Sequence, residues 1–320
     1  MDFETALNSC IFRYVSGSYA YGTERPDSDR DYRGVFIAPM VSSFQVFVGE
    51  DENGLPNSGV QTVHHPKRDE ELQELRKFLK LAADCNPNIL EYLYTDRLIA
   101  ITTPVWEKIR SHRDWFLSKK ARFTFSGYCF SQLKRIRTHR GYLLNPPTHK
   151  PTRAEFDLPE TSTIDKEHRK SVVSIPDRWI NPKAKVLVNA ERAFESALTD
   201  WNAYNKWLTE RNPARREMER KSGFDLKHSV HLVRLFRMGK EILRDGEVHV
   251  YRPDRDELRA ILNGEWSYDK IEALVAESEA ELETLYKQST LRDKPDRAAI
   301  QDLYLEICEE FYGIKLRGDL

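Results

Sequence analysis

The chain has 320 residues, of which 40% are hydrophobic, and its 50 Lys and Arg nearly balance its 51 Asp and Glu. This much apolar material is enough for a full core and for two domains. The net charge of -1 excludes a chain-wide basic field of the kind that marks many nucleic-acid binders. No apolar run approaches the roughly 20 residues that span a bilayer, and the four cysteines are scattered without a CxxC pair. We therefore expect a cytoplasmic protein with reduced thiols and no membrane partner.

Strand-like and helix-like segments alternate over the first hundred residues, which predicts a small sheet combined with helices. Residues 11–16 (IFRYVS) and 31–38 (DYRGVFIA) are rich in aromatic and β-branched side chains and are typical of strands. Residues 59–65 are a candidate third strand. Between the first two strands, GSYAYGTERPDS holds glycines, a proline and capping residues, which favours a short helical turn followed by a loop.

Two helices are predicted after these strands. In the first, apolar side chains recur at steps of three and four residues and define one buried face. Its members are Leu72, Leu75, Phe78, Leu79 and Ala82. The second helix begins in the sequence NPNILEYLY, where Asn86 is placed to cap the helix and Pro87 to occupy its first turn.

Beyond residue 100 the periodicity is mostly helical, so we expect a catalytic core at residues 1–100 and a helical domain at residues 101–320. The predicted helices are residues 116–140, 186–208, 226–243, 271–286 and 298–311. Residues 145–182 hold six prolines, too many for regular structure, and we expect a mobile or substrate-covering excursion there. The expected fold class is α+β, with a small mixed sheet and a C-terminal helical domain.

The most informative motif is Gly17-Ser18, followed by Asp29 and Asp31 just before an apolar strand. Alternate residues of a strand share a face, so Asp29 and Asp31 are expected to project together. Two neighbouring carboxylates repel each other, and a divalent cation such as Mg²⁺ (or Mn²⁺) relieves that repulsion. Gly17 allows close approach of the backbone to a phosphate, and Ser18 opens a helical turn whose free N–H groups favour an anion.

This combination predicts a site for metal-assisted transfer of a nucleotidyl group from a nucleoside triphosphate, with two metal ions as the expected number. A third carboxylate normally completes such a site and orients or deprotonates the attacking hydroxyl. The candidates are Asp69, Glu70 and Glu71, at the expected entry to the first helix. The competing interpretation is that the acids near residue 29 only shape a polar loop.

The run GSYAYGTERPDSDRDYRGVF resembles the signature of the DNA polymerase β nucleotidyltransferase superfamily. It is most similar to the branch of predicted nucleotidyltransferases associated with RNA ligases and RNA repair. Three later segments support that branch: ELRKFLKLAADCNPNILEYLY, GYCFSQLKR and KHSVHLVRLFRMGKEIL. The resemblance implies a mixed sheet that carries the metal site, a helical domain beside it and a nucleoside triphosphate bound between them.

By this resemblance Gly17 and Ser18 bind phosphates, and Asp29 and Asp31 bind metal. Two features depart from the family pattern. Arg30 stands between the two acids where an apolar residue is common, and no clean apolar strand surrounds the third acid. For that third position we favour Asp69, with Glu71 second.

Basic residues of two predicted helices are further candidates for phosphate contacts. Lys227, His228, His231 and Arg234 share one helical face, along which a triphosphate or an RNA backbone could lie. Lys134, with Arg135 beside it, has the same interpretation on the earlier helix. The alternative for every one of these residues is ordinary helix solvation.

Two classes of function follow from the sequence. The first is an enzyme that transfers a nucleoside monophosphate to an acceptor hydroxyl, with RNA ends as the expected acceptor and a protein side chain or small molecule as the alternative. The second is a nucleotide- or RNA-binding regulator, such as an antitoxin-like partner, without turnover. The paired acids favour the enzyme, because a pure binder needs no metal site of this kind.

Overall fold

The computed structural model describes residues 1–41, 62–162, 168, 171 and 174–316. The chain divides into two compact units: unit 1 comprises residues 1–134 and 226–320, and unit 2 comprises residues 135–225. The expected catalytic core at residues 1–100 lies within unit 1, and the expected helical region is divided between the units. Unit 1 therefore combines the N-terminal and C-terminal parts of the chain.

Unit 1 is built on a mixed sheet that has five strands among the described residues, in the order β3-β4-β2-β1-β5. The strands are β1 (Cys10–Val15), β2 (Tyr32–Phe36), β3 (Thr62–His64), β4 (Glu70–Glu74) and β5 (Ile99–Thr102). Strands β2 and β4 are parallel, whereas β1 is antiparallel to β2 and β5, and β3 is antiparallel to β4. The expected third strand is present as β3, and residues 59–61 lie outside the described residues.

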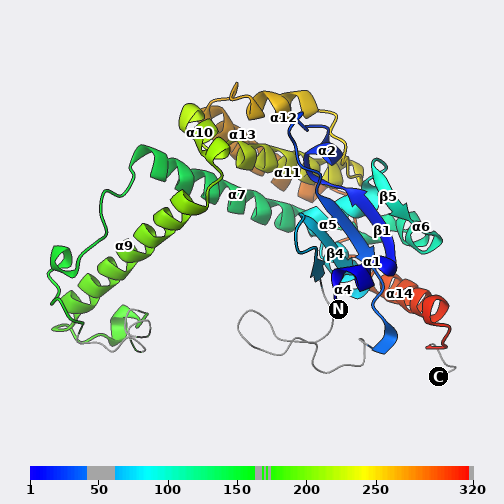
Figure 1. The fold of residues 1–320 in the computed structure, drawn as a ribbon, viewed down its shortest axis with the longest axis horizontal. Helices are drawn as coiled ribbons and strands as arrows, with labels where there is room; N and C mark the ends of the chain where they lie inside the picture. The colour runs from blue at the N-terminus through cyan, green and yellow to red at the C-terminus, as the bar shows by residue number, and fades with distance from the viewer. Residues whose placement is uncertain (42–61, 163–167, 169–170, 172–173, 317–320) are drawn as a thin grey trace. The chain divides into compact units, whose positions relative to one another are not determined.

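Helices cover both faces of this sheet (Figure 1). On one face, Phe3 of α1 (Phe3–Asn8) joins a buried cluster with Phe36 and Leu72. On the opposite face, the Phe12 ring stacks on the Trp106 ring with their centroids 4.0 Å apart. These buried aromatic and aliphatic side chains fix the sheet between its helices because their apolar area leaves water on both faces.

The remaining helices of unit 1 precede and follow unit 2 in the chain. Those before it are α2 (Gly17–Tyr21), α4 (Leu75–Ala83), α5 (Pro87–Tyr94), α6 (Pro104–Ser111), the 3₁₀ helix η1 (Arg113–Phe116) and the first part of α7 (Ala121–Leu144). Those after it are α11 (Leu226–Asp245), α12 (Arg255–Leu262), α13 (Tyr268–Gln288) and α14 (Arg297–Tyr312). The mixed sheet and the helical C-terminal region confirm the expected α+β class.

The described residues of unit 2 form helices and connecting loops, with no strand among them. Besides the end of α7 this unit contains η2 (Arg153–Phe156), η3 (Asp177–Trp179), α9 (Lys185–Glu210) and α10 (Pro213–Ser222). Both 3₁₀ helices belong to the Pro-rich segment 145–182, part of which lies outside the described residues. In the part of the chain that the structure covers, no helix combines the length and the apolarity needed to cross a membrane.

Candidate functional site

The Gly–Ser turn and the second acid of the motif meet at one corner of the sheet. Strand β1 ends at Val15, and the backbone N–H of Ser16 donates a 2.8 Å hydrogen bond to the carbonyl oxygen of Asp31. Gly17 has a φ of +67°, and a Cβ added there would lie 2.8 Å from Oδ2 of Asp31. Glycine is therefore required at position 17 twice over, by the left-handed backbone and by the carboxylate against it.

The carboxyl group of Asp31 has a shifted pKa. Its pKa is raised first by burial and then by the neighbouring carboxylate of Asp69, with a smaller contribution from Asp29. Arg33 and Lys227 act in the opposite direction. Like charges gathered around a half-buried acid fit a divalent cation, because the cation removes the repulsion that the folded chain otherwise carries.

The sequence pattern predicted that the two acids of the motif project from a strand, but neither of them lies within one. Strand β2 begins at Tyr32, so Asp29 and Asp31 both precede it. Asp31 lines a cavity, whereas Asp29 is exposed and lies outside the cavity lining. Between them in the chain, the Arg30 guanidinium lies over the Tyr19 ring, 5.4 Å from its centroid.

The segment that carries the third acid is a strand, which corrects the predicted start of the first amphipathic helix. Residues 70–74 form β4, paired in parallel with β2, and helix α4 begins at Leu75. Side chains alternate between the two faces of a sheet along each strand, so Glu70 and Glu71 of β4 point to opposite faces. Glu71 lies opposite Arg33 of β2 in the register. The three candidate acids therefore have three different environments.

Each of these environments is defined by contacts. Asp69 is exposed and forms an ion pair with Arg33, with 2.8 Å between Oδ1 and Nη2. Glu70 faces the side of the sheet away from the cavity, where its fully buried side chain accepts a 2.7 Å bond from Nε of Arg13. Glu71 faces the cavity and accepts a hydrogen bond from the side chain of Gln73.

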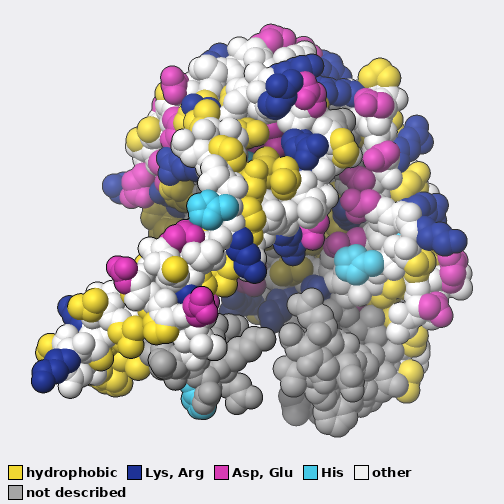
Figure 2. All heavy atoms as spheres, turned by 60° about the vertical axis from the view of Figure 1, so that its left-hand side comes forward, with side chains coloured by type: hydrophobic (Ala, Val, Ile, Leu, Met, Phe, Trp, Pro, Cys, Tyr) yellow, Lys and Arg dark blue, Asp and Glu magenta, His cyan; other side chains and the backbone are white. Residues whose placement is uncertain are grey.

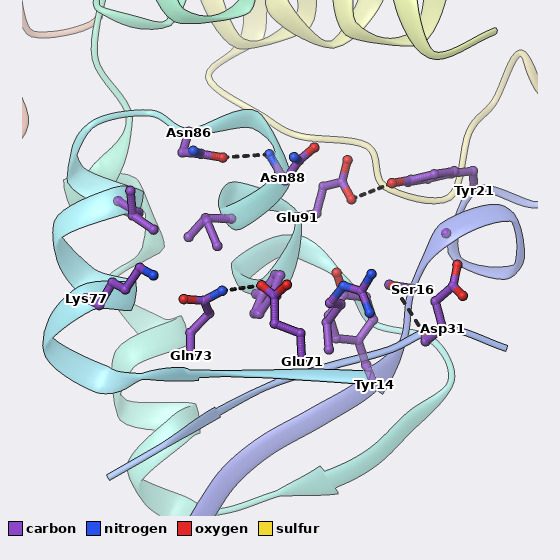
Figure 3. Close-up of a pocket in the computed structure, with 15 residues that line it drawn as sticks. Tyr14, Ser16, Tyr21, Asp31, Glu71, Gln73, Lys77, Asn86, Asn88 and Glu91 are labelled. Atoms are coloured by element: carbon purple, nitrogen blue, oxygen red, sulfur yellow. Dashed lines mark hydrogen bonds between the residues drawn. The ribbon is translucent and has the colours of Figure 1, made fainter. Parts of the chain in front are cut away.

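The cavity has a volume of about 390 Å³ and lies entirely within unit 1. Figure 3 shows Ser16 and Asp31 at one end and Lys77 at the other, with Glu71 and Gln73 between them. The lining is mostly polar. Its residues are Tyr14, Ser16, Gly17, Tyr21, Asp31, Arg33, Glu71, Gln73, Lys77, Leu81, Asn86, Asn88, Ile89, Glu91 and Tyr92.

The structure places the other candidate phosphate-binding residues outside the cavity lining. Ser18 belongs to the first turn of α2, and Lys134 is exposed on α7. Lys227 is exposed at the start of α11, yet its charge acts on the pKa of Asp31. Nδ1 of His228 lies 2.7 Å from Oε1 of Gln132. Of these residues, Lys227 thus has the most direct electrostatic link to the corner.

A buried network behind α2 was not anticipated from the sequence. Arg234 is 1% exposed and forms an ion pair with Glu91, which also accepts a 2.8 Å hydrogen bond from the hydroxyl of Tyr21. The guanidinium of Arg234 lies over the Tyr21 ring at 3.7 Å from its centroid. Arg234 is therefore interior, not part of a solvated or phosphate-binding helix face. The sequence did hold a signal for this buried pair, because Glu91 and Arg234 are each the single charged residue of an apolar run, ILEYL and LVRLF.

A glycine turn set against clustered carboxylates at the corner of a mixed sheet is the arrangement that a resemblance to the DNA polymerase β superfamily implies. Comparison with protein families agrees. Residues 3–144 match the model of the RNA repair pathway DNA polymerase beta family, which confirms the resemblance inferred from the sequence.

One curated relative is a protein of Enterobacteria phage T4, described as an uncharacterized 38.9 kDa protein in the nrdC-mobD intergenic region. It is 27% identical to the chain over 132 residues, which cover 39% of this chain and 38% of the phage protein. The chain thus aligns with well under half the length of this relative. No solved structure gives a significant match.

Proposed function

We propose that the protein is a metal-dependent nucleotidyltransferase that transfers a nucleoside monophosphate from a nucleoside triphosphate, such as ATP, to an acceptor hydroxyl at an RNA end. The match to a polymerase-β-like family of RNA repair supports the class and the acceptor. The observation that carries the proposal is the position of Asp31, whose carboxylate lies against the Gly17 turn inside a cavity and whose pKa is raised by burial and by neighbouring acids.

In this proposal Asp29, Asp31 and Asp69 hold Mg²⁺ or Mn²⁺, with Glu71 as the alternative third ligand. The bound ions supply charge neutralisation at the triphosphate. The backbone at Gly17, which has no side chain in the way, admits a phosphate oxygen at close range. Ser18, Lys134, Lys227 and His228 are the further proposed contacts of the triphosphate.

The reaction forms one P–O bond and breaks another. The acceptor hydroxyl oxygen attacks the α-phosphorus, the bond to the β-phosphate oxygen breaks, and pyrophosphate leaves. The hydroxyl proton passes to a carboxylate. The two candidates are Glu71, which lines the cavity, and Asp69, which is outside the lining and forms an ion pair with the lining residue Arg33. The third acid of the site is therefore either Glu71 or Asp69, and substitution of each distinguishes them.

The test is incubation with each α-labelled nucleoside triphosphate, Mg²⁺ or Mn²⁺, and either total RNA or total protein. Label in RNA, with pyrophosphate released and both lost in an Asp31→Asn variant, is the expected result. Label in protein or in a small molecule would keep the transferase and replace the acceptor. Tight binding of nucleotide or RNA without any pyrophosphate release would favour the regulator instead.

A further inference from the structure

The cavity continues well beyond the corner at which the proposed chemistry takes place. Its far part, here called the distal end, is formed by β4, α4 and the start of α5, opposite Ser16 and Asp31 (Figure 3). The residues of the distal end are Gln73, Lys77, Leu81, Asn86, Asn88 and Ile89. None of them is needed to hold a metal or a triphosphate at the Gly17 corner.

The chemistry of transfer assigns a direction to this cavity. In an in-line displacement the attacking oxygen and the leaving oxygen lie on opposite sides of the α-phosphorus. In a pose with the pyrophosphate at the Gly17 turn and the α-phosphorus beside Asp31, the attacking hydroxyl approaches from the side that faces away from Gly17. Glu71 lies on that side, between Asp31 and the distal end (Figure 3). In this pose the distal end lies on the side from which the acceptor approaches.

We propose that the distal end binds the terminal ribonucleotide of an acceptor RNA, with its sugar hydroxyl beside Glu71 and its phosphate at Lys77. This inference rests on the proposed function and adds to it the site of the acceptor. Residues of the distal end are also candidates for selecting which RNA end is used.

The charges of the cavity single out Lys77 for this role. Arg33 is paired with Asp69, and Glu91 is paired with Arg234, so these side chains are already neutralised. Among the described residues Lys77 has no ion pair, and its ammonium group donates to the hydroxyl of Thr62. Two of its three N–H donors remain available, and a compact ammonium charge is well suited to a phosphate.

The remaining side chains of the distal end suit a nucleoside. The side-chain amide of Asn88 is exposed and has no hydrogen-bond partner within the described part of the chain, so it can bond to a base edge or a sugar hydroxyl. Asn86 is held in place because its side chain donates a 2.9 Å hydrogen bond to the hydroxyl of Tyr128 and caps α5. Gln73 is held by hydrogen bonds with the side chains of Glu71 and Thr62. Leu81 and Ile89 provide apolar surface of the kind on which a flat base can lie.

The test measures RNA binding separately from turnover. A fluorescently labelled single-stranded RNA of ten nucleotides with free hydroxyl ends is titrated with wild type, Lys77→Gln, Asn88→Ala and Lys80→Gln, and ATP affinity is measured in parallel. Lys80 is the matched control, because it is an exposed lysine of the same helix that does not line the cavity.

The expected result is an RNA affinity lowered about tenfold or more in Lys77→Gln and less in Asn88→Ala, with the Lys80→Gln variant unchanged and ATP affinity within twofold of wild type throughout. The proposal would be overturned if Lys77→Gln and Lys80→Gln bound RNA equally well. It would also be overturned if Lys77→Gln lowered the affinity for ATP and left the affinity for RNA unchanged. Absence of pyrophosphate release with every triphosphate, together with RNA binding that depends on Lys77, would refute the transferase and leave the RNA site standing. Transfer to other acceptors by an enzyme that does not bind the RNA would do the reverse.

Discussion

At the scale of single residues, the Gly17 corner shows how a short motif specifies geometry. The positive φ of Gly17 and the Oδ2 of Asp31, 2.8 Å from where a Cβ would lie, both exclude any other residue. The sequence predicted that Gly17 and Asp31 act together, because both belong to one short turn-and-loop segment between two strand-like runs. It could not predict Ser16, whose backbone and hydroxyl both bond to the carbonyl of Asp31, since serine after a strand has many uses.

Gly17→Ala should therefore damage both stability and transfer. A non-glycine residue in the left-handed region costs about 1–3 kcal/mol, and the new methyl group must displace the Asp31 carboxylate. Urea unfolding measures the first effect and pyrophosphate release the second. Gly127→Ala is the control, because Gly127 lies within α7 with nothing within 4 Å of an added Cβ. That variant should gain up to about 1 kcal/mol, and equal behaviour of the two variants would contradict the account.

Asp31→Asn should stabilise the metal-free protein while abolishing transfer. Burial and neighbouring acids raise the pKa of Asp31, so its ionisation opposes folding. This cost appears as pH rises through the ordinary value of 3.8 and is complete above the raised pKa. The variant should melt a few degrees higher than wild type at pH 7 and at the same temperature near pH 3. Mg²⁺ should raise the melting temperature of wild type only; a variant that melts lower at pH 7 would show that the raised pKa is not a cost to the fold.

At the scale of elements, strand β4 shows where periodicity misleads. The run EELQELRKFLKLAA has helical spacing throughout, yet its first five residues form a strand. Local propensity is overridden there by pairing of β4 with β2 and β3, which no local pattern records. The helix from Leu75 onward and the capped start of α5 were predicted correctly, because amphipathic spacing and a cap are local signals.

The alternation along β4 predicts opposite outcomes for two adjacent glutamates. Glu70→Gln weakens a buried contact with Arg13 on the face away from the cavity and should lower stability by about 1–3 kcal/mol with near-normal transfer. Glu71→Gln removes a carboxylate from the cavity and should lower kcat tenfold or more with little change in stability. Urea unfolding and single-turnover rates distinguish them. If Asp69→Asn, and not Glu71→Gln, stops transfer, Asp69 is the third acid.

The buried pair that joins α5 to α11 predicts strong coupling between two substitutions. Arg234→Met leaves the Glu91 carboxylate without its ion-pair partner and should cost about 3–5 kcal/mol of the free energy of unfolding. Adding Glu91→Gln removes the orphaned charge and keeps an acceptor for the hydroxyl of Tyr21, so most of the loss should return. A double-mutant cycle in urea measures the coupling. Additive losses would show that the two side chains act independently.

At the scale of the whole molecule, the net charge of -1 conceals an uneven distribution. Residues 135–225 carry 18 Lys and Arg against 13 Asp and Glu, whereas the rest of the chain carries 32 against 38. Among the residues of unit 2 that the structure describes, three acids are buried and paired, Glu191 with Arg153 and both Glu219 and Asp225 with Arg211. The surface in Figure 2 interleaves both signs. Whole-chain composition could not show this, because the excess in one unit cancels the deficit in the other.

The basic excess of unit 2 predicts that it contributes charge to RNA binding. Lys206 and Arg216 are exposed and have no acidic partner among the described residues. Reversing both charges with Lys206→Glu and Arg216→Glu should weaken RNA binding several-fold, because each phosphate contact with a single strand adds about 0.7 to the dependence of log K on log salt. The slope should fall by about 1.4 for two lost contacts, with ATP affinity unchanged. Lys294→Glu with Lys315→Glu is the control of equal charge in unit 1, where both lysines are exposed. An equal loss in the control pair would mean that net charge acts at long range over the whole chain, and unit 2 would then have no special part in holding RNA.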